Sequence, residues 1–302
     1  MIRPRRGPLL PGEQVQLTDP KGRSHLVLLQ PGRAFHTHQG SLAHDDLIGG
    51  QDGSVVTSSG GTAYVALRPL LADFTLAMRR GAAVVYPKDA AQILAVADVF
   101  PAARVLEAGA GSGALSCWLL RAIGEAGLLV SYERRADFAE IARGNADRYF
   151  GAPHPAWRLA VRELPAGQPV DAGQPGERFD RVVLDMLAPW EYVGTAAQSL
   201  AGGGLICCYV ASTTQLSRVV EALREQGSFA EPAASESLVR GWHVDGLAVR
   251  PEHRMVGHTG FLVTARRLAD GVTPPPRRRR PAKGAHDSAA WRHRDGAADS
   301  TA

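Results

Sequence analysis

The stretch that decides the fold is Arg104-Val105-Leu106-Glu107-Ala108-Gly109-Ala110-Gly111-Ser112-Gly113-Ala114-Leu115. It begins with an apolar run of strand length, continues through three glycines and ends in a run with helical spacing. Glycine has no Cβ, so the backbone can turn sharply here and a ligand can lie against it. Ser112 is the expected N-cap of the following helix. Such a strand-turn-helix unit is the usual nucleotide or adenosyl site of a doubly wound sheet.

This motif alone leaves the ligand open. Gly109, Gly111 and Ala114 satisfy the dinucleotide pattern G-x-G-x-x-G/A. The same residues, read from Glu107 to Gly113, satisfy the pattern E-x-G-x-G-x-G of S-adenosylmethionine sites. A tight turn that binds nothing is the third interpretation. The rest of the chain has to decide among them.

Composition narrows the class of protein. The chain has 302 residues, of which 45% are hydrophobic, enough for one large domain or two ordinary ones. Its three cysteines, Cys117, Cys207 and Cys208, lack metal-ligand spacing and indicate a reducing compartment. No apolar run has the length of a signal core or a membrane span. We therefore expect a soluble, cytoplasmic protein.

The net charge of +4 is concentrated at the chain ends. Residues 271–302 hold seven Lys or Arg against three Asp, which equals the whole formal excess. Arg3, Arg5 and Arg6 add positive charge at the other end. The body between them is not basic, so it would bind a polyanion through local patches. The two ends would add a non-specific attraction that salt weakens.

The chain divides into three parts by pattern. Residues 1–75 predict a small β-domain with a basic N-terminal arm, because short Val-, Leu- and Thr-rich runs alternate with glycine turns. Residues 76–270 predict alternating strands and helices. Residues 271–302, rich in Pro, Arg and Ala, predict a disordered basic tail. The tail would be a solvated spacer or an auxiliary RNA-binding arm. The strands expected in the first part are 12–17, 24–29, 54–58 and 63–67.

The middle part predicts a mostly parallel sheet with helices on both faces, the Rossmann-like plan of an α/β protein. A proline-started helix is expected from Pro87 to about Val99. The final runs, 238–249 and 260–265, are expected to pair as a C-terminal β-hairpin that completes a seven-stranded sheet. The other strands expected are 104–107, 128–133, 157–161, 179–184 and 205–210. The other helices expected are 112–124, 135–149, 189–200 and 213–226.

Two histidines in the first part invite a metal-site interpretation. His36 and His38 flank Thr37, but no third or fourth ligand lies at a suitable spacing. We expect polar residues on a loop and no metal site. With Phe35 and Arg33, the same loop could also contact nucleic acid.

Acidic residues follow four successive strands of the predicted sheet: Glu107, Glu133, Glu163 and Asp185. The ligand of a parallel sheet lies across the carboxyl ends of its strands, so these carboxylates should surround it. Glu133, 20 residues beyond Gly113, is placed to accept ribose hydroxyls. Glu163 would reach an adenine amino group. Glu107 would act on water or on the amino group of a methionine moiety.

The run from Leu184 to Trp190 favours methylation of a base nitrogen over hydride transfer. Adenine N1 is a weak, neutral nucleophile. A carboxylate such as Asp185, accepting a hydrogen bond from the adjacent exocyclic amine, would push electron density onto N1 and stabilise the cationic product. Trp190 would form a pocket wall, or it is simply a packed aromatic after a helix-starting proline.

Five segments together resemble the tRNA adenine-N1 methyltransferases that modify adenine-58 of the T loop. The resemblance spans roughly residues 10–268, and the motifs occur in the family's order. It rests on residues 35–40, 86–93, 105–115, 184–190 and 257–262.

The resemblance implies a class I methyltransferase fold after a small β-domain, S-adenosylmethionine as methyl donor, tRNA as substrate and a homotetramer. It implies Asp185 as the catalytic residue. Residues expected in the substrate pocket are Tyr86, Gln92, Trp190 and His258. The donor-site residues expected are Glu107, Gly109, Gly111, Ser112, Gly113, Ala114, Leu115, Glu133, Phe138, Glu163 and Asp185.

Two positions depart from the family pattern. Arg162-Glu163 stands where relatives have Asp, so the adenine contact needs a longer side chain. Phe138 stands where relatives have a polar residue. The alternatives to the tRNA enzyme are a methyltransferase acting on another RNA or a small molecule, and a non-catalytic RNA-binding subunit. A nicotinamide dehydrogenase would need a substrate domain with a His or Lys acid, which the sequence lacks.

Overall fold

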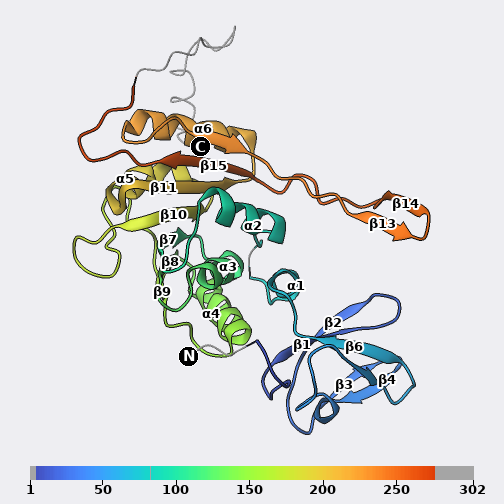
Figure 1. Ribbon diagram of the computed structural model, residues 1–302. Helices are drawn as coiled ribbons and strands as arrows, with labels where there is room; N and C mark the ends of the chain where they lie inside the picture. Colours follow the sequence, from blue (N-terminus) through green and yellow to red (C-terminus); the bar gives the residue numbers. More distant parts are fainter. Residues whose placement is uncertain (1–4, 82, 276–302) are drawn as a thin grey trace, which may run out of the picture.

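The N-terminal region is a small antiparallel β-structure. The computed structural model describes residues 5–81 and 83–275. Four strands form a sheet in the order β2-β1-β6-β5, at the lower right of Figure 1. Val15 and Leu17 face inward on β1, where they pack with Tyr64 and Ala66 of β6. These strands are β1 (Gln14–Thr18), β2 (Ser24–Leu28), β5 (Ser54–Thr57) and β6 (Ala63–Leu67).

A two-stranded hairpin occupies the segment that the sequence predicted as a loop. Strands β3 (Ala34–Thr37) and β4 (Gly40–Ala43) pair with each other, and the short 3-10 helix η1 (His44–Asp46) follows. Strands of four residues carry too little alternation to be distinguished from a loop. His36 and His38 are exposed there.

Two helices connect the N-terminal sheet to the second one. Helix α1 (Leu71–Ala77) was not predicted, because seven residues span too few turns for a clear helical period. Helix α2 (Pro87–Val96) begins at the expected proline. It ends before Val99, contrary to the prediction. The physical reason is Asp98, whose φ of +49° is left-handed and cannot continue a helix.

The second sheet has seven strands in the order β12-β15-β11-β10-β7-β8-β9, and this confirms the predicted α/β fold class. The five strands from β11 to β9 are parallel to one another, whereas β15 is antiparallel to both of its neighbours. The strands are β7 (Arg104–Ala108), β8 (Leu128–Glu133), β9 (Trp157–Val161), β10 (Phe179–Asp185), β11 (Leu200–Val210), β12 (Ala233–Ser235) and β15 (Phe261–Arg266).

Helices cover both faces of this sheet (Figure 1). Successive strand residues point to opposite faces, so Val105 joins one core cluster and Leu106 the other. Cys207 and Cys208 divide in the same way, and both are buried free thiols. Helices α3 (Ala114–Ile123) and α4 (Ala136–Phe150) lie on the face of α1 and α2. The other face holds η2 (Pro189–Tyr192), α5 (Val193–Ser199) and α6 (Thr213–Gln226).

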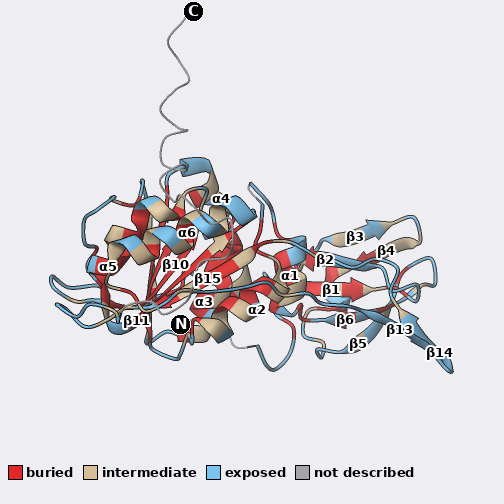
Figure 2. Ribbon diagram, turned by 90° about the horizontal axis from the view of Figure 1, so that it is seen from above, coloured by how far each residue is buried: buried red, intermediate tan, exposed pale blue. Residues whose placement is uncertain are grey.

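The predicted pairing of 238–249 with 260–265 is wrong. Residues 242–251 form a separate hairpin, with β13 (Trp242–Asp245) paired to β14 (Ala248–Pro251). The sheet partner of β15 is β12. Figure 1 shows the hairpin extending far from the sheet, and Figure 2 shows its residues exposed. We call residues 238–257 the arm.

The arm carries a row of exposed apolar side chains. Trp242 is 57% exposed, Val244 67% and Val249 55%, and Leu247 at the tip is fully exposed. An apolar, alternating segment looks the same in sequence whether it pairs with a sheet or extends from it, which explains the wrong prediction. Among the described residues, no helix is long and apolar enough to cross a membrane. The predicted disordered tail lies outside the described residues from position 276 onward.

Candidate active site

A cleft of about 1040 Å³ opens at the carboxyl ends of β7, β8, β10 and β11. This is where a doubly wound sheet binds its ligand, because the strand order reverses there. Its volume suits a ligand of nucleoside size with a second group beside it. Eight of the predicted site residues line it: Tyr86, Gly109, Gly111, Glu133, Phe138, Glu163, Asp185 and His258.

The glycine turn packs directly against the end of β10. Gly109 has a φ of +89°, and a Cβ on it would lie 1.7 Å from the carbonyl oxygen of Asp185. No other residue fits this position. The Gly109 N–H donates to the carbonyl of Tyr132 on β8 at 3.0 Å. The turn is therefore fixed between two strands, and its open side faces the cleft.

Ser112 is not the N-cap of the helix, contrary to the prediction. Helix α3 begins at Ala114 with Gly113 as its N-cap, and no side chain caps it. Gly113 has a left-handed φ of +77°, so it still belongs to the turn, which continues one residue further than expected. A Cβ at this position would lie 3.0 Å from the backbone of Ala142. The Ser112 hydroxyl instead accepts a hydrogen bond from the Gly81 N–H at 3.1 Å. It thereby ties residues 79–81 to the turn.

Glu133, at the end of β8, is 7% exposed and points its carboxylate at the glycine turn. Oε2 accepts from the Gly111 N–H at 2.9 Å, and Oε1 accepts from the Arg135 N–H at 2.9 Å. Two backbone donors therefore fix the carboxylate at the cleft wall. A carboxylate has about four acceptor positions, so both oxygens keep capacity for a ligand hydroxyl.

Glu107 lies behind the turn and not on the cleft surface. It is completely buried, and its Oε2 accepts from the hydroxyls of Ser116 and Ser131. Its Oε1 has no partner among the described residues. Burial raises the pKa of Glu107 to about 7. A buried carboxylate with one unsatisfied oxygen fits a site that receives a cationic or hydrogen-bond-donating ligand group.

Asp185 ends β10 at the floor of the cleft, beside the glycine turn. Its side chain is half-buried. Desolvation raises the pKa of Asp185 to about 7, and the carboxylates of Glu107 and Glu133 contribute through repulsion. The charged form of Asp185 is therefore costly unless a cation or a hydrogen-bond donor lies beside it.

One wall of the cleft combines Glu163 with aromatic and cationic groups. The Tyr192 hydroxyl donates to Glu163 Oε1 at 2.7 Å, and burial together with this bond raises the pKa of Tyr192 to about 12. The Arg135 guanidinium lies 3.9 Å from the ring centre of Phe138. A phenyl ring at position 138 thus provides a flat surface with a cation above it, where relatives were expected to have a polar group.

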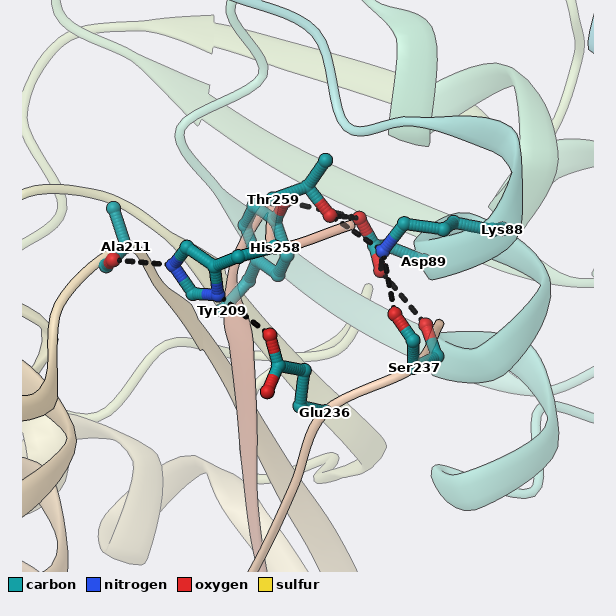
Figure 3. A network of polar contacts seen from close by, with 8 residues as sticks. All are labelled: Lys88, Asp89, Tyr209, Ala211, Glu236, Ser237, His258 and Thr259. Carbon is teal, nitrogen blue, oxygen red and sulfur yellow. Dashed lines mark hydrogen bonds and ion pairs between the residues drawn. The ribbon is translucent and has the colours of Figure 1, made fainter. Parts of the chain in front are cut away.

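The opposite wall contains Tyr86, Tyr209, His258 and Thr259. Figure 3 shows that two of these residues, Tyr209 and Thr259, are hydrogen-bonded to Asp89 of α2. His258 bridges the Glu236 carboxylate, at 2.7 Å, and the Ala211 carbonyl, at 2.9 Å. These two acceptors raise the pKa of His258 above its ordinary value.

Seven predicted residues do not line the cleft. Five of them are buried: Ser112 and Gly113 in the turn, Ala114 and Leu115 in α3, and Glu107 behind the turn. Gln92 lies on α2 away from the cleft. The ring of Trp190 packs under the Arg218 guanidinium at 5.2 Å and against the core, which matches the packed-aromatic interpretation.

Sequence reasoning missed three cleft tyrosines, Tyr132, Tyr192 and Tyr209. Tyr192 is the last residue of the 3-10 helix η2, which lies where the sequence predicted the start of a longer helix. Tyr209 pairs with Asp185 across β10 and β11, so the strand-end rule that selected the acids would have found it had aromatic residues been included.

A doubly wound sheet with a glycine turn after β7, carboxylates at successive strand ends and an antiparallel last strand defines a class I S-adenosylmethionine-dependent methyltransferase. Residues 62–245 match the family model described as tRNA methyltransferase complex GCD14 subunit. Residues 7–56 match the model described as TrmI-like N-terminal. The chain belongs to this family of tRNA methyltransferases.

Named relatives agree with this assignment. The chain is 36% identical over 261 residues to the tRNA (adenine(58)-N(1))-methyltransferase TrmI of Thermus thermophilus, covering 86% of this chain and 97% of the relative. It is 30% identical over 279 residues to the tRNA (adenine(57)-N(1)/adenine(58)-N(1))-methyltransferase TrmI of Methanocaldococcus jannaschii, covering 86% and 95%.

Two crystal structures share the fold over nearly the whole chain. A SAM-dependent O-methyltransferase of Thermotoga maritima superposes with a TM-score of 0.78 and 29% identity, covering 90% of this chain and 96% of that one. The tRNA (m1A58) methyltransferase TrmI of Aquifex aeolicus gives a TM-score of 0.71 and 25% identity, covering 87% and 99%.

Proposed function

We propose that this protein transfers a methyl group from S-adenosylmethionine to N1 of adenine-58 in the T loop of tRNA. The observation that carries the proposal is Asp185, a half-buried acid at the cleft floor that contacts the glycine turn. It lies where a target base and an adenosyl donor would meet. The family and the named relatives support the choice of tRNA and of adenine-58.

The residues of the cleft fit S-adenosylmethionine. The turn at Gly109 and Gly111 leaves room for backbone to approach the donor, and Glu133 would accept its ribose hydroxyls. Glu163 would accept from its adenine amino group. The raised pKa values of Glu107 and Asp185 show that their negative charge is costly there, and a sulfonium cation nearby would stabilise it. The donor supplies an electrophilic methyl group whose bond to sulfur breaks with the electron pair remaining on sulfur.

Asp185 would act on the target adenine. Its carboxylate would accept a hydrogen bond from the exocyclic amine, which raises the electron density on N1 and stabilises the positive charge that the product carries. No proton has to leave, because the charge moves from sulfur to the base. Tyr86, Tyr209 and His258 would hold the base in line with the methyl group, and correct alignment is a large part of such catalysis.

Basic side chains at the cleft rim would hold the tRNA backbone. Arg134, Arg135 and Arg162 line the cleft, and the exposed Arg79 and Arg80 lie beside the glycine turn through the Gly81–Ser112 bond. Lys88 is only 8% exposed and bonded to Asp89, so we exclude it from the RNA surface.

The arm would join copies of the chain into the expected homotetramer, because its exposed apolar row is otherwise in contact with water. We also propose that residues 1–75 form the RNA-holding β-domain, that residues 76–270 perform the transfer and that the protein works in the cytoplasm, where tRNA is modified.

The proposal is tested by incubating an unmodified tRNA transcript with the protein and S-adenosylmethionine, followed by nucleoside mass spectrometry. We expect N1-methyladenosine in the wild-type transcript and none in a transcript with guanosine at position 58. Asp185→Asn should lower the rate by about 10²-fold or more. Methylation of another nucleoside, or transfer at the wild-type rate by Asp185→Asn, would refute the assignment.

A further inference from the structure

A buried ion pair lies directly behind the cleft wall that contains Tyr209. Asp89 is 1% exposed, and its Oδ1 lies 2.6 Å from Nζ of Lys88, whose side chain is 8% exposed. Both residues belong to the first turn of α2, immediately after Tyr86 of the cleft. Taking two charges out of water is costly, so such a pair persists where further hydrogen bonds complete it.

Every hydrogen-bonding position of this pair is occupied (Figure 3). Lys88 Nζ donates to Asp89, to the Ser237 carbonyl at 2.8 Å and to the Thr259 hydroxyl at 2.5 Å. An ammonium group has three donors, and all three are used. We call Lys88, Asp89, Tyr209, Ser237 and Thr259 the clasp.

The Asp89 carboxylate is equally saturated. Oδ1 accepts from Lys88 and from the Ser237 hydroxyl at 2.9 Å, and Oδ2 accepts from the Tyr209 hydroxyl at 3.1 Å and from the Thr259 hydroxyl. Four donors fill its four acceptor positions. A fully satisfied buried network of this kind rigidifies the groups it joins.

The clasp joins the start of α2 to three other parts of the chain, all far from it in sequence. Asp89 lies 120 residues from Tyr209 on β11, 148 from Ser237 and 170 from Thr259. Ser237 immediately precedes the arm, and Thr259 follows it after His258. The same carboxylate therefore holds a cleft tyrosine and both ends of the arm.

Two members of the clasp, Tyr209 and Thr259, line the cleft. Tyr209 is the one that pairs with Asp185 on the neighbouring strand. A Cβ on Gly260 would lie 2.5 Å from the Tyr209 ring, so backbone presses on one side of the ring while Asp89 holds its hydroxyl. The ring has one position available, next to the carboxylate that we assign to catalysis.

We propose that Asp89 is a positioning residue for the target base, acting by fixing Tyr209 on the cleft wall and tying both ends of the arm to that wall. The inference rests on the proposed function. A fixed ring beside Asp185 would orient the adenine so that N1 points at the methyl group. Asp89 itself does not line the cleft and touches neither reactant.

Two variants separate this role from support of the fold. Tyr209→Phe removes only the hydroxyl and leaves the ion pair intact, whereas Asp89→Asn removes the carboxylate. We expect each to lower the single-turnover methyl-transfer rate by about tenfold at saturating tRNA and donor, since orientation is lost. Donor affinity, measured by calorimetry, should change by less than about twofold, because the donor site is separate.

The double variant tests whether the two residues act as one unit. If Asp89 acts through Tyr209, Asp89→Asn with Tyr209→Phe should be no slower than the slower single variant, within about twofold. The control is Glu177→Gln. It breaks the ion pair between Glu177 Oε1 and the Arg104 guanidinium, which are 2.9 Å apart at the end of β7 that lies away from the cleft. This variant should keep the wild-type rate.

The outcomes distinguish this inference from the function on which it rests. Absence of N1-methyladenosine with the wild-type protein would overturn the proposed function. An active wild type together with a wild-type rate in folded Tyr209→Phe would overturn the positioning role alone. Equal losses of rate and donor affinity, or additive losses in the double variant, would also overturn it, because they indicate general support of the fold.

Discussion

At the scale of single residues, the position with the least freedom is Gly109. Its Cβ would overlap the Asp185 carbonyl, and its backbone is left-handed. We expect Gly109→Ala to abolish donor binding and to lower the melting temperature. Gly144→Ala is the matched control, since a Cβ there meets open space in the middle of α4 and should stabilise the protein by about 1 kcal/mol. Donor binding by the alanine variant at 109, measured by calorimetry, would contradict the close packing.

Asp185 makes the reaction sensitive to pH. With a raised pKa of about 7, the carboxyl is largely protonated at pH 6, and the neutral acid is a weaker acceptor that lacks the negative charge needed to stabilise the methylated base. We expect kcat/KM for the donor to rise between pH 6 and pH 8 with a midpoint near 7, because this parameter reports the free enzyme. Residual activity of Asp185→Asn should lack that step. A flat wild-type profile would argue against an acid as the activating group.

Glu107 should make stability fall as pH rises. Its pKa is raised from an ordinary value near 4.5 to about 7, so the folded state holds this proton more tightly than the unfolded chain. Ionisation of Glu107 does not affect the free energy of unfolding below about pH 4, and its destabilising effect is complete above about pH 7. Glu107→Gln, whose amide oxygen can still accept from Ser116 and Ser131, should melt higher than wild type at about pH 8 and equally at about pH 4. Equal melting at both values would show that the carboxyl carries no penalty.

The sequence predicted the acids at the strand ends but not the walls around them. Glu133 and Asp185 follow from counting strands, because a parallel sheet brings its carboxyl ends to one edge. Tyr192 lies in the cleft only because η2 turns the chain there, and no periodicity marks a single 3-10 turn. The cap of α3 was missed because Gly113 is held by its contact with Ala142, a tertiary contact that local propensity does not contain.

At the scale of elements, the arm is separable from the sheet. Strand β12 pairs with β15 through Ser235 and Leu262, so the chain leaves and re-enters the sheet at one place. The hydrophobic pattern predicted apolar strands at 238–249 and 260–265, but it does not show which other strand or surface each of them packs against. The same limit applies to β3 and β4, whose four-residue lengths resemble loops. Long, strongly periodic elements such as α6 were predicted to the residue.

Shortening the arm should dissociate the protein without unfolding it. If the protein forms the proposed tetramer, we expect replacement of residues 240–255 by a four-residue Gly-Ser linker to convert it to smaller species, because the apolar row from Trp242 to Val249 is removed. Light scattering after gel filtration measures the mass. Leu247→Ser, at the fully exposed tip, is a milder variant that should weaken assembly in the same direction. An unchanged mass for the shortened chain would exclude the arm from assembly.

At the scale of the whole molecule, charge is divided between a near-neutral body and basic ends. We expect a chain ending at residue 275 to bind tRNA more weakly at low salt and to show a shallower dependence of affinity on salt, because fewer phosphates are neutralised. Filter binding at 50 and 200 mM salt, chosen as roughly spanning the strongly dependent range, measures both. Methyl transfer at saturating tRNA should be unchanged. A loss of affinity that is independent of salt would indicate a folded contact instead.

The position of β15 bears on how the protein is made. This strand lies between β11 and β12, although it is the last strand in the described part of the chain. During synthesis from the N-terminus, the apolar strand β11 therefore has an open edge until residue 266 has left the ribosome. An open apolar edge invites pairing with other chains. We therefore expect a polypeptide that ends before β15 to keep this apolar edge open and to aggregate, whereas one that ends after β15 should not.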